Sequence, residues 1–124
     1  MNVHIIGGGN LGASIAIGIA KFTTGNQVTV TRRNTTNILH LEPLGVTVSK
    51  DNKHNIQNAD IIILTIKPYQ VDTVLEEILP VIANKTIASA VSGLSMENLQ
   101  NKIGNTHQAV RIMPNIASQF GASA

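Results

Sequence analysis

The chain has no cysteine and no tryptophan, and its few aromatic residues are one tyrosine and two phenylalanines. Without cysteine it can form no disulfide and no thiolate metal site, which fits a reducing compartment, so we expect a cytoplasmic protein. The net charge is only +2, and the basic residues are scattered apart from the pair Arg32-Arg33. With no basic stripe and almost no aromatic side chains to stack on bases, we expect no nucleic-acid partner. No apolar run is long enough to span a bilayer, so we expect no membrane partner.

Charged residues (Asp, Glu, Lys and Arg) are also scarce, at 13% of the chain. Asp72, Glu76 and Glu77 are expected to form the solvated face of a helix. No Ser-His-Asp arrangement is assignable, so the catalytic residue and the general acid stay unknown. None of the histidines has metal-ligand spacing to another histidine or a carboxylate, so we expect no metal; they are His4 (expected to be packed), His40, His54 and His107.

Apolar residues are abundant, at 43% of the chain. Because aromatic residues are few, Ile, Val, Leu and Ala must build the core. A length of 124 residues predicts one domain. A core of branched aliphatic side chains favours a parallel sheet with both faces covered.

The most informative stretch is the glycine-rich segment Gly7, Gly8, Gly9, Asn10, Leu11 and Gly12, which lies between an apolar run and a helical pattern. A G-x-G-x-x-G turn in this setting is typical of sites for the diphosphate of a dinucleotide. The first glycine permits the tight turn, the second lets the backbone approach the phosphates, and the third lets the helix pack near the strand. The N–H groups at the helix start then face the anion. No Gly-Lys-Ser/Thr follows, which excludes a P-loop.

Strand and helix patterns alternate almost throughout the chain. This alternation predicts an α/β fold of the Rossmann type, a doubly wound and mostly parallel sheet in the order 3-2-1-4-5-6 with helices on both faces. Ligands of such sheets bind at the carboxyl ends of the strands. We predict strands at 2–6, 27–31, 46–48, 61–66, 86–91 and 109–113, helices at 10–22, 35–41, 71–82 and 96–103, short helical turns within 51–58, and no periodicity in 115–124.

The end of the second predicted strand indicates which dinucleotide is bound. An NAD site usually has a carboxylate there to hold the ribose hydroxyls, but Thr31 is followed by Arg32, Arg33 and Asn34. Guanidinium groups match phosphate oxygens, whereas a carboxylate would repel them. The residues therefore favour NADP(H) over NAD(H). The alternative is that both arginines are solvated loop residues.

The chain resembles pyrroline-5-carboxylate reductase in segments that follow the family's order over nearly the whole chain. The Met-Pro-Asn segment at 113–115 is the most specific of them. The segment after the asparagine departs from the family's usual Thr-Pro or Thr-Ala. The matching segments are 5–12, the pair Asn52-Lys53, 60–68, 89–94 and 111–115.

The resemblance implies hydride transfer from NADPH to the C=N carbon of 1-pyrroline-5-carboxylate, which gives L-proline. The substrate would be a small imino acid. In the family a C-terminal helical domain forms the dimer and supplies most of the substrate pocket, and this chain lacks it. We therefore expect 1–124 to be an NADP-binding domain with little turnover alone, and a candidate homo-oligomer. The implied cofactor contacts are Gly7, Gly8, Gly9, Asn10, Leu11, Gly12, Thr31, Arg32, Arg33, Asn34, Asn52, Thr65, Ile66, Lys67, Pro68, Ala90, Val91, Ser92, Met113 and Asn115.

Two other functions remain open. One is a different NADP-dependent oxidoreductase with the same N-terminal fold, such as an F420-dependent NADP reductase or a hydroxyacid dehydrogenase. The Met-Pro-Asn segment argues against both. The other is a nucleotide-binding module with no chemistry of its own. Lys67 and Ser92 follow strands and are either ligand contacts or ordinary exposed turn residues, and Tyr69 is expected to pack on the following helix.

Overall fold

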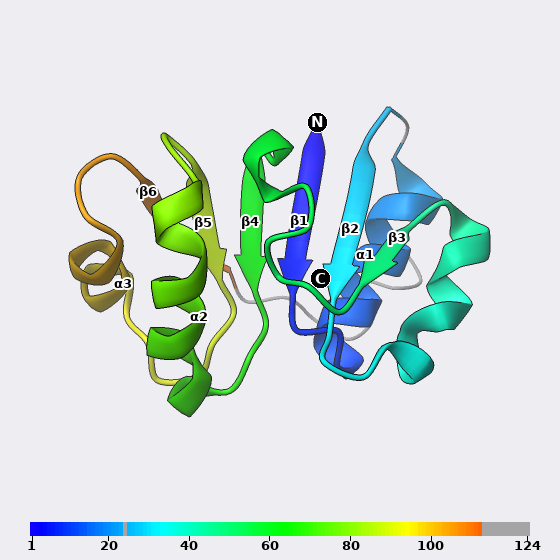
Figure 1. The fold of residues 1–124 in the computed structure, drawn as a ribbon, viewed down its shortest axis with the longest axis horizontal. Coiled ribbons are helices and arrows are strands. Elements are labelled where there is room, and N and C mark those ends of the chain that lie inside the picture. The colour runs from blue at the N-terminus through cyan, green and yellow to red at the C-terminus, as the bar shows by residue number, and fades with distance from the viewer. Residues whose placement is uncertain (24, 113–124) are drawn as a thin grey trace.

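The computed structural model describes residues 1–23 and 25–112, so Met113 and Asn115 lie outside the described residues. Six strands form one sheet in the order β3-β2-β1-β4-β5-β6, and every neighbouring pair is parallel. Figure 1 shows the strand arrows running in one direction, with their carboxyl ends at the same edge. The predicted fold class and strand order are confirmed. The strands are β1 (Asn2–Ile6), β2 (Gln27–Thr31), β3 (Thr47–Ser49), β4 (Ile61–Leu64), β5 (Thr86–Ser89) and β6 (Gln108–Arg111).

Within the described residues, three α-helices and four 3₁₀-helices connect the strands. The predicted helices at 10–22 and 96–103 have the predicted bounds. The second of these begins where the Ser95 hydroxyl accepts a hydrogen bond from the Asn98 amide at 3.0 Å, and it ends at Gly104, whose φ is 83°. The helices are α1 (Asn10–Phe22), η1 (Thr35–Leu44), η2 (Ile56–Asn58), η3 (Pro68–Gln70), α2 (Val71–Ile78), η4 (Leu79–Val81) and α3 (Met96–Ile103).

Two predicted helices differ in form, and each reaches a proline in the structure. The segment predicted as a helix over 35–41 is a 3₁₀-helix that includes Pro43 and continues to Leu44 before Gly45 ends it. The helix predicted to reach 82 ends as an α-helix at Ile78 and continues as a 3₁₀ turn containing Pro80. Proline has no N–H to donate along the α-helical ladder, so the helix changes form there.

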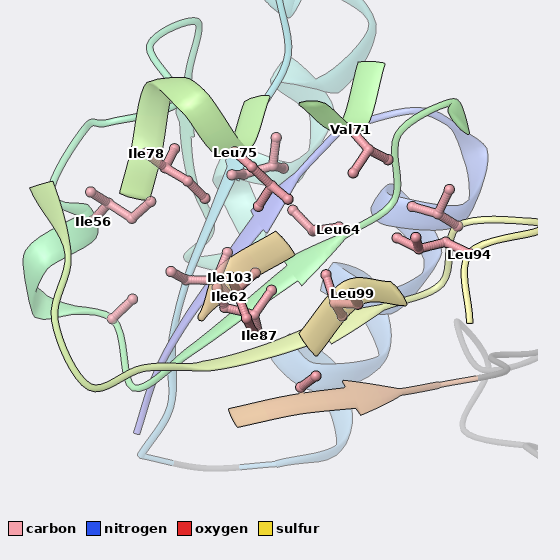
Figure 2. Close-up of a cluster of buried hydrophobic side chains, with 14 residues drawn as sticks. Ile56, Ile62, Leu64, Val71, Leu75, Ile78, Ile87, Leu94, Leu99 and Ile103 are labelled. Carbon is pink, nitrogen blue, oxygen red and sulfur yellow. The ribbon is translucent and has the colours of Figure 1, made fainter. Parts of the chain in front are cut away.

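Two buried clusters occupy the two faces of the sheet. One lies between the sheet and helices α2 and α3, and Figure 2 shows its side chains converging from strands and helices. The other lies between the sheet, α1 and η1. Figure 1 shows α2 on the near side of the sheet and α1 behind it. The labelled members of the first cluster are Ile56, Ile62, Leu64, Val71, Leu75, Ile78, Ile87, Leu94, Leu99 and Ile103.

The β1–β2 part of the near face is polar. His4 pairs with Thr29 in the register of β1 and β2, and Thr31 lies on the same face two residues further on. Figure 1 shows the connection from β3 to β4 crossing in front of these strands. On the other half of the same face the sheet is covered by the helix α2. His4 is buried here, as predicted.

No helix in the described part of the chain is both long enough and apolar enough to cross a membrane. Within the same residues, no group of three or more histidine, aspartate and glutamate side chains could hold a metal ion.

Candidate functional site

The glycine turn joins β1 to α1 at the carboxyl edge of the sheet. The backbone N–H groups of Gly7 and Gly8 both donate to the carbonyl of Thr31, each at 3.0 Å. Gly7 has a φ of 103°, which side chains rarely allow. An added Cβ on Gly12 would lie 2.1 Å from the Gly7 carbonyl oxygen. These two glycines are therefore required by the turn and by the approach of helix to strand.

Gly9 differs from its neighbours. Among the described residues, an added Cβ at this position would meet no atom within 4 Å. Packing therefore does not require a glycine here. Gly9 is the N-cap of α1. Within residues 1–23, no side chain caps this helix and no acidic residue lies in its first turn. The N–H groups there have no partner from a preceding turn and carry the positive end of the helix dipole. This open cradle of donors suits a diphosphate.

A cavity of about 440 Å³ opens beside the glycine turn. It lies between the first turns of α1 on one side and η1 on the other. A guanidinium nitrogen of Arg32 donates to the Gly8 carbonyl at 3.2 Å, which holds this arginine across the turn. No carboxylate lines the cavity among the described residues. Its lining residues are Gly8, Gly9, Asn10, Ala13, Ser14, Ile17, Arg32, Asn37 and His40.

The other predicted contacts at the end of β2 do not line this cavity. Arg33 is exposed, and the Asn34 side chain accepts a hydrogen bond from the Thr36 amide at 3.0 Å, which caps η1. Thr31 is fully buried. Its hydroxyl donates to the Asn52 side-chain oxygen at 2.6 Å, so its direct effect is to fix Asn52 and, through its carbonyl, the glycine turn.

Asn52 reaches the site from the connection between β3 and β4. Its carbonyl accepts a hydrogen bond from Nε2 of His4 at 2.8 Å. A carbonyl can only accept, so Nε2 of His4 carries a hydrogen and donates it. Burial lowers the pKa of His4, the hydrogen bond to Asn52 raises it, and the charges of His54 and Asp51 lower and raise it respectively. The buried histidine thus anchors a connection that carries a predicted contact.

The strand ends next to β1 supply the remaining described residues. The Thr65 hydroxyl lies 2.6 Å from the Gly7 carbonyl and 3.1 Å from that of Ile6, so it ties β4 to the turn. Lys67 is exposed. The Ala90 amide donates to the Leu64 carbonyl at 3.0 Å, which holds the end of β5 beside that of β4. The structure thus brings most predicted contacts to one edge; the others there are Ile66, the exposed Pro68, the buried Val91 and the exposed Ser92.

Tyr69 is 82% exposed, so the expectation that it packs on α2 is wrong for this structure. It lies in the 3₁₀ turn η3, ahead of the buried face of α2.

The sequence analysis did not include Asn37 and His40 among the candidate contacts. Both belong to η1 and line the cavity. Their spacing of three residues indicates that they lie side by side only when the segment is known to be a 3₁₀-helix, because side chains three residues apart lie on one face of such a helix.

A parallel sheet of this order, with a glycine turn that opens on a free helix start, defines a dinucleotide-binding domain of the Rossmann type. The family described as NADP oxidoreductase, coenzyme F420-dependent, matches residues 2–93, and the chain belongs to this family.

Individual relatives carry a more specific description. The chain is 36% identical over 120 residues to pyrroline-5-carboxylate reductase 1 of Dictyostelium discoideum, covering 94% of the chain and 22% of the relative. A solved pyrroline-5-carboxylate reductase from Coxiella burnetii is similar with a TM-score of 0.86 and 29% identity, covering 98% of this chain and 47% of the other. The Plasmodium falciparum enzyme with NADP bound shares the fold, with a TM-score of 0.83, 23% identity, and coverage of 99% and 45%. The chain spans less than half the length of each.

Proposed function

We propose that this chain binds NADP(H) for the reduction of 1-pyrroline-5-carboxylate to L-proline. The open space at Gly9, beside the unpaired amides of α1, is the single observation that carries the proposal. The substrate is suggested by the names of the relatives, which are pyrroline-5-carboxylate reductases. A similar fold holds NADP in the Plasmodium falciparum enzyme.

The bound nicotinamide would supply the hydride, while the chain binds and orients the cofactor. The N–H groups at the start of α1 would hold the diphosphate, and Thr65 and Thr31 would keep the glycine turn in shape through its carbonyl and N–H groups. Because the chain spans less than half of its relatives, we propose that further residues complete the imino-acid pocket. Met113 and Asn115 stay predicted contacts near the nicotinamide.

The preference for NADP(H) over NAD(H) is part of the proposal. Arg32 lines the cavity, and no described lining residue is acidic. Titrating the chain with NADPH and NADH, by fluorescence of the reduced nicotinamide, tests it. We expect tighter binding of NADPH, and loss of that preference in the double variant Arg32→Glu, Arg33→Glu. Equal affinities in the parent chain would contradict the role given to these arginines.

Turnover separates an enzyme from a binding module. With 1-pyrroline-5-carboxylate and NADPH, followed by NADPH absorbance, we expect little or no turnover from this chain. Robust turnover would show that the chain itself contains a complete substrate pocket. Failure to bind either dinucleotide would exclude the proposed function altogether.

The family's description favours a second candidate, electron exchange between NADP and coenzyme F420. Reduction of NADP by reduced F420 in the presence of the chain would support this candidate, and it would not be expected of an imino-acid reductase.

We also propose that copies of the chain associate. β6 lies at one edge of the described sheet, and an exposed edge offers unpaired backbone groups to another chain. Sedimentation over a range of concentrations tests this, and a constant monomer mass would refute it. The cysteine-free sequence supports our proposal of a cytoplasmic location, which cell fractionation would check.

A further inference from the structure

One wall of the cavity belongs to η1, through Asn37 and His40. We infer that these two side chains, together with Arg32, hold the phosphate on the adenosine ribose and set the preference for the phosphorylated dinucleotide. The inference rests on the proposed function and deepens it, because it names which residues recognise the ribose phosphate.

The form of η1 places the two side chains together. In a 3₁₀-helix, side chains three residues apart eclipse one another, so Asn37 and His40 share a face. The start of the helix is fixed by the Asn34 cap, and Ile38 between them is fully buried against the core behind the turn. Because Ile38 is packed into the core, it fixes the part of the backbone from which Asn37 and His40 line the cavity.

Arg32 also lines this cavity. Its bond to the Gly8 carbonyl keeps the guanidinium beside the turn that would hold the diphosphate. Arg33 is exposed and does not line the cavity. A ribose phosphate in the cavity would therefore have Arg32, Asn37 and His40 along its wall.

The charges around the cavity favour an anion. Arg32 and His40 are the ionisable residues among those that line it in the described chain. Of the elements that pack against η1, β3 has no ionisable residue and α1 has Lys21 in its last turn. Within η1 the other ionisable group is Glu42, which is exposed. A ribose phosphate carries nearly two negative charges at neutral pH, so it complements the cavity.

Calorimetric titration with 2′,5′-ADP and with ADP isolates the contribution of the ribose phosphate. We expect the parent chain to bind 2′,5′-ADP about tenfold more tightly or better, as charge-assisted hydrogen bonds commonly give. His40→Gln and the isosteric Asn37→Asp should each remove most of that ratio while ADP affinity stays near the parent value. His54→Gln, an exposed histidine outside the cavity, is the matched control and should keep the ratio.

The outcomes separate the two levels of the argument. If neither ADP nor 2′,5′-ADP binds the folded parent chain, the proposed function fails. If both bind equally well, or if His40→Gln and Asn37→Asp both keep the parent ratio, this inference fails while the dinucleotide site stands. Should His40→Gln lose its circular dichroism signal, Asn37→Asp alone decides, because its shape matches the parent side chain.

Discussion

Substitution by alanine should have different effects at two glycines of the same turn: it should lower the stability of the fold at Gly12 and weaken NADPH binding at Gly9. Gly12→Ala would put a Cβ 2.1 Å from the Gly7 carbonyl oxygen and 2.7 Å from the Thr65 hydroxyl, below the 3.0 Å that real contacts respect. Forcing backbone apart in this way costs about 1–3 kcal/mol, and losing the Thr65 hydrogen bond costs about 1 kcal/mol more. Better helix propensity returns about 1 kcal/mol. We expect a net loss of about 1–3 kcal/mol.

Gly9→Ala should leave the fold nearly intact, because the added Cβ meets no described atom within 4 Å. Alanine is a poorer N-cap than glycine, which costs roughly 0.5–1 kcal/mol. The same Cβ would occupy the place where the diphosphate approaches the backbone, so NADPH binding should weaken about tenfold or more.

Thermal unfolding by circular dichroism and NADPH titration by fluorescence measure both effects. For a chain of this size, about 1 kcal/mol shifts Tm by roughly 3–5 °C. Gly12→Ala should therefore melt roughly 3–15 °C below the parent, and Gly9→Ala only a few degrees below it. Each variant is the control for the other. A Gly9→Ala chain that binds NADPH like the parent, or a Gly12→Ala chain that melts like it, would refute this account of the turn.

Three further predictions concern the surroundings of the site. Thr65→Val removes the hydroxyl that bonds the Gly7 carbonyl at 2.6 Å, so unfolding in urea should show a loss of about 1–2 kcal/mol. Burial lowers the pKa of His4, so as the pH falls the unfolded chain takes up a proton on this histidine before the folded chain does. Tm should therefore fall as the pH drops below about 6.5 and stay flat above that value. His4→Gln should make Tm less dependent on pH in this range. Asp72→Asn breaks an exposed ion pair with Lys102 at 2.7 Å and should change stability by less than about 1 kcal/mol, measured by the same unfolding curves.

The fold could be predicted from the sequence because its signals are local and agree with one another. The buried strand at β4 is a run of isoleucines ending in leucine, and α3 is bounded by Ser95 and Gly104, residues that cap helices by their own chemistry. Alternation of strands with helices then leaves few topologies, since parallel crossovers are right-handed. Strand ends were less accurate. β4 was predicted to reach Ile66 but ends at Leu64, although the Thr65 amide still donates to the Ile6 carbonyl at 3.0 Å.

The site could be predicted only in part. The glycine motif and Arg32 were found because each follows directly after a strand. Asn37 and His40 were missed because their position depends on η1 being a 3₁₀-helix, a form that no apolar periodicity indicates. Arg33 and Asn34 looked equivalent to Arg32 in the sequence, and only the structure shows which of the three lines the cavity.

The polar half of the near face shows how a distant contact can be hidden in a local pattern. A parallel strand covered on both faces should be apolar throughout, yet His4 and Thr31 point to the same face of β1 and β2. Such positions cannot pack against an apolar helix without leaving polar groups unpaired. They are satisfied here by Asn52, through its carbonyl at 2.8 Å and its side chain at 2.6 Å. The polar residues on these strands therefore require a polar connection across them. This requirement places Asn52, a predicted cofactor contact, next to Thr31, whose carbonyl accepts the hydrogen bonds of the glycine turn.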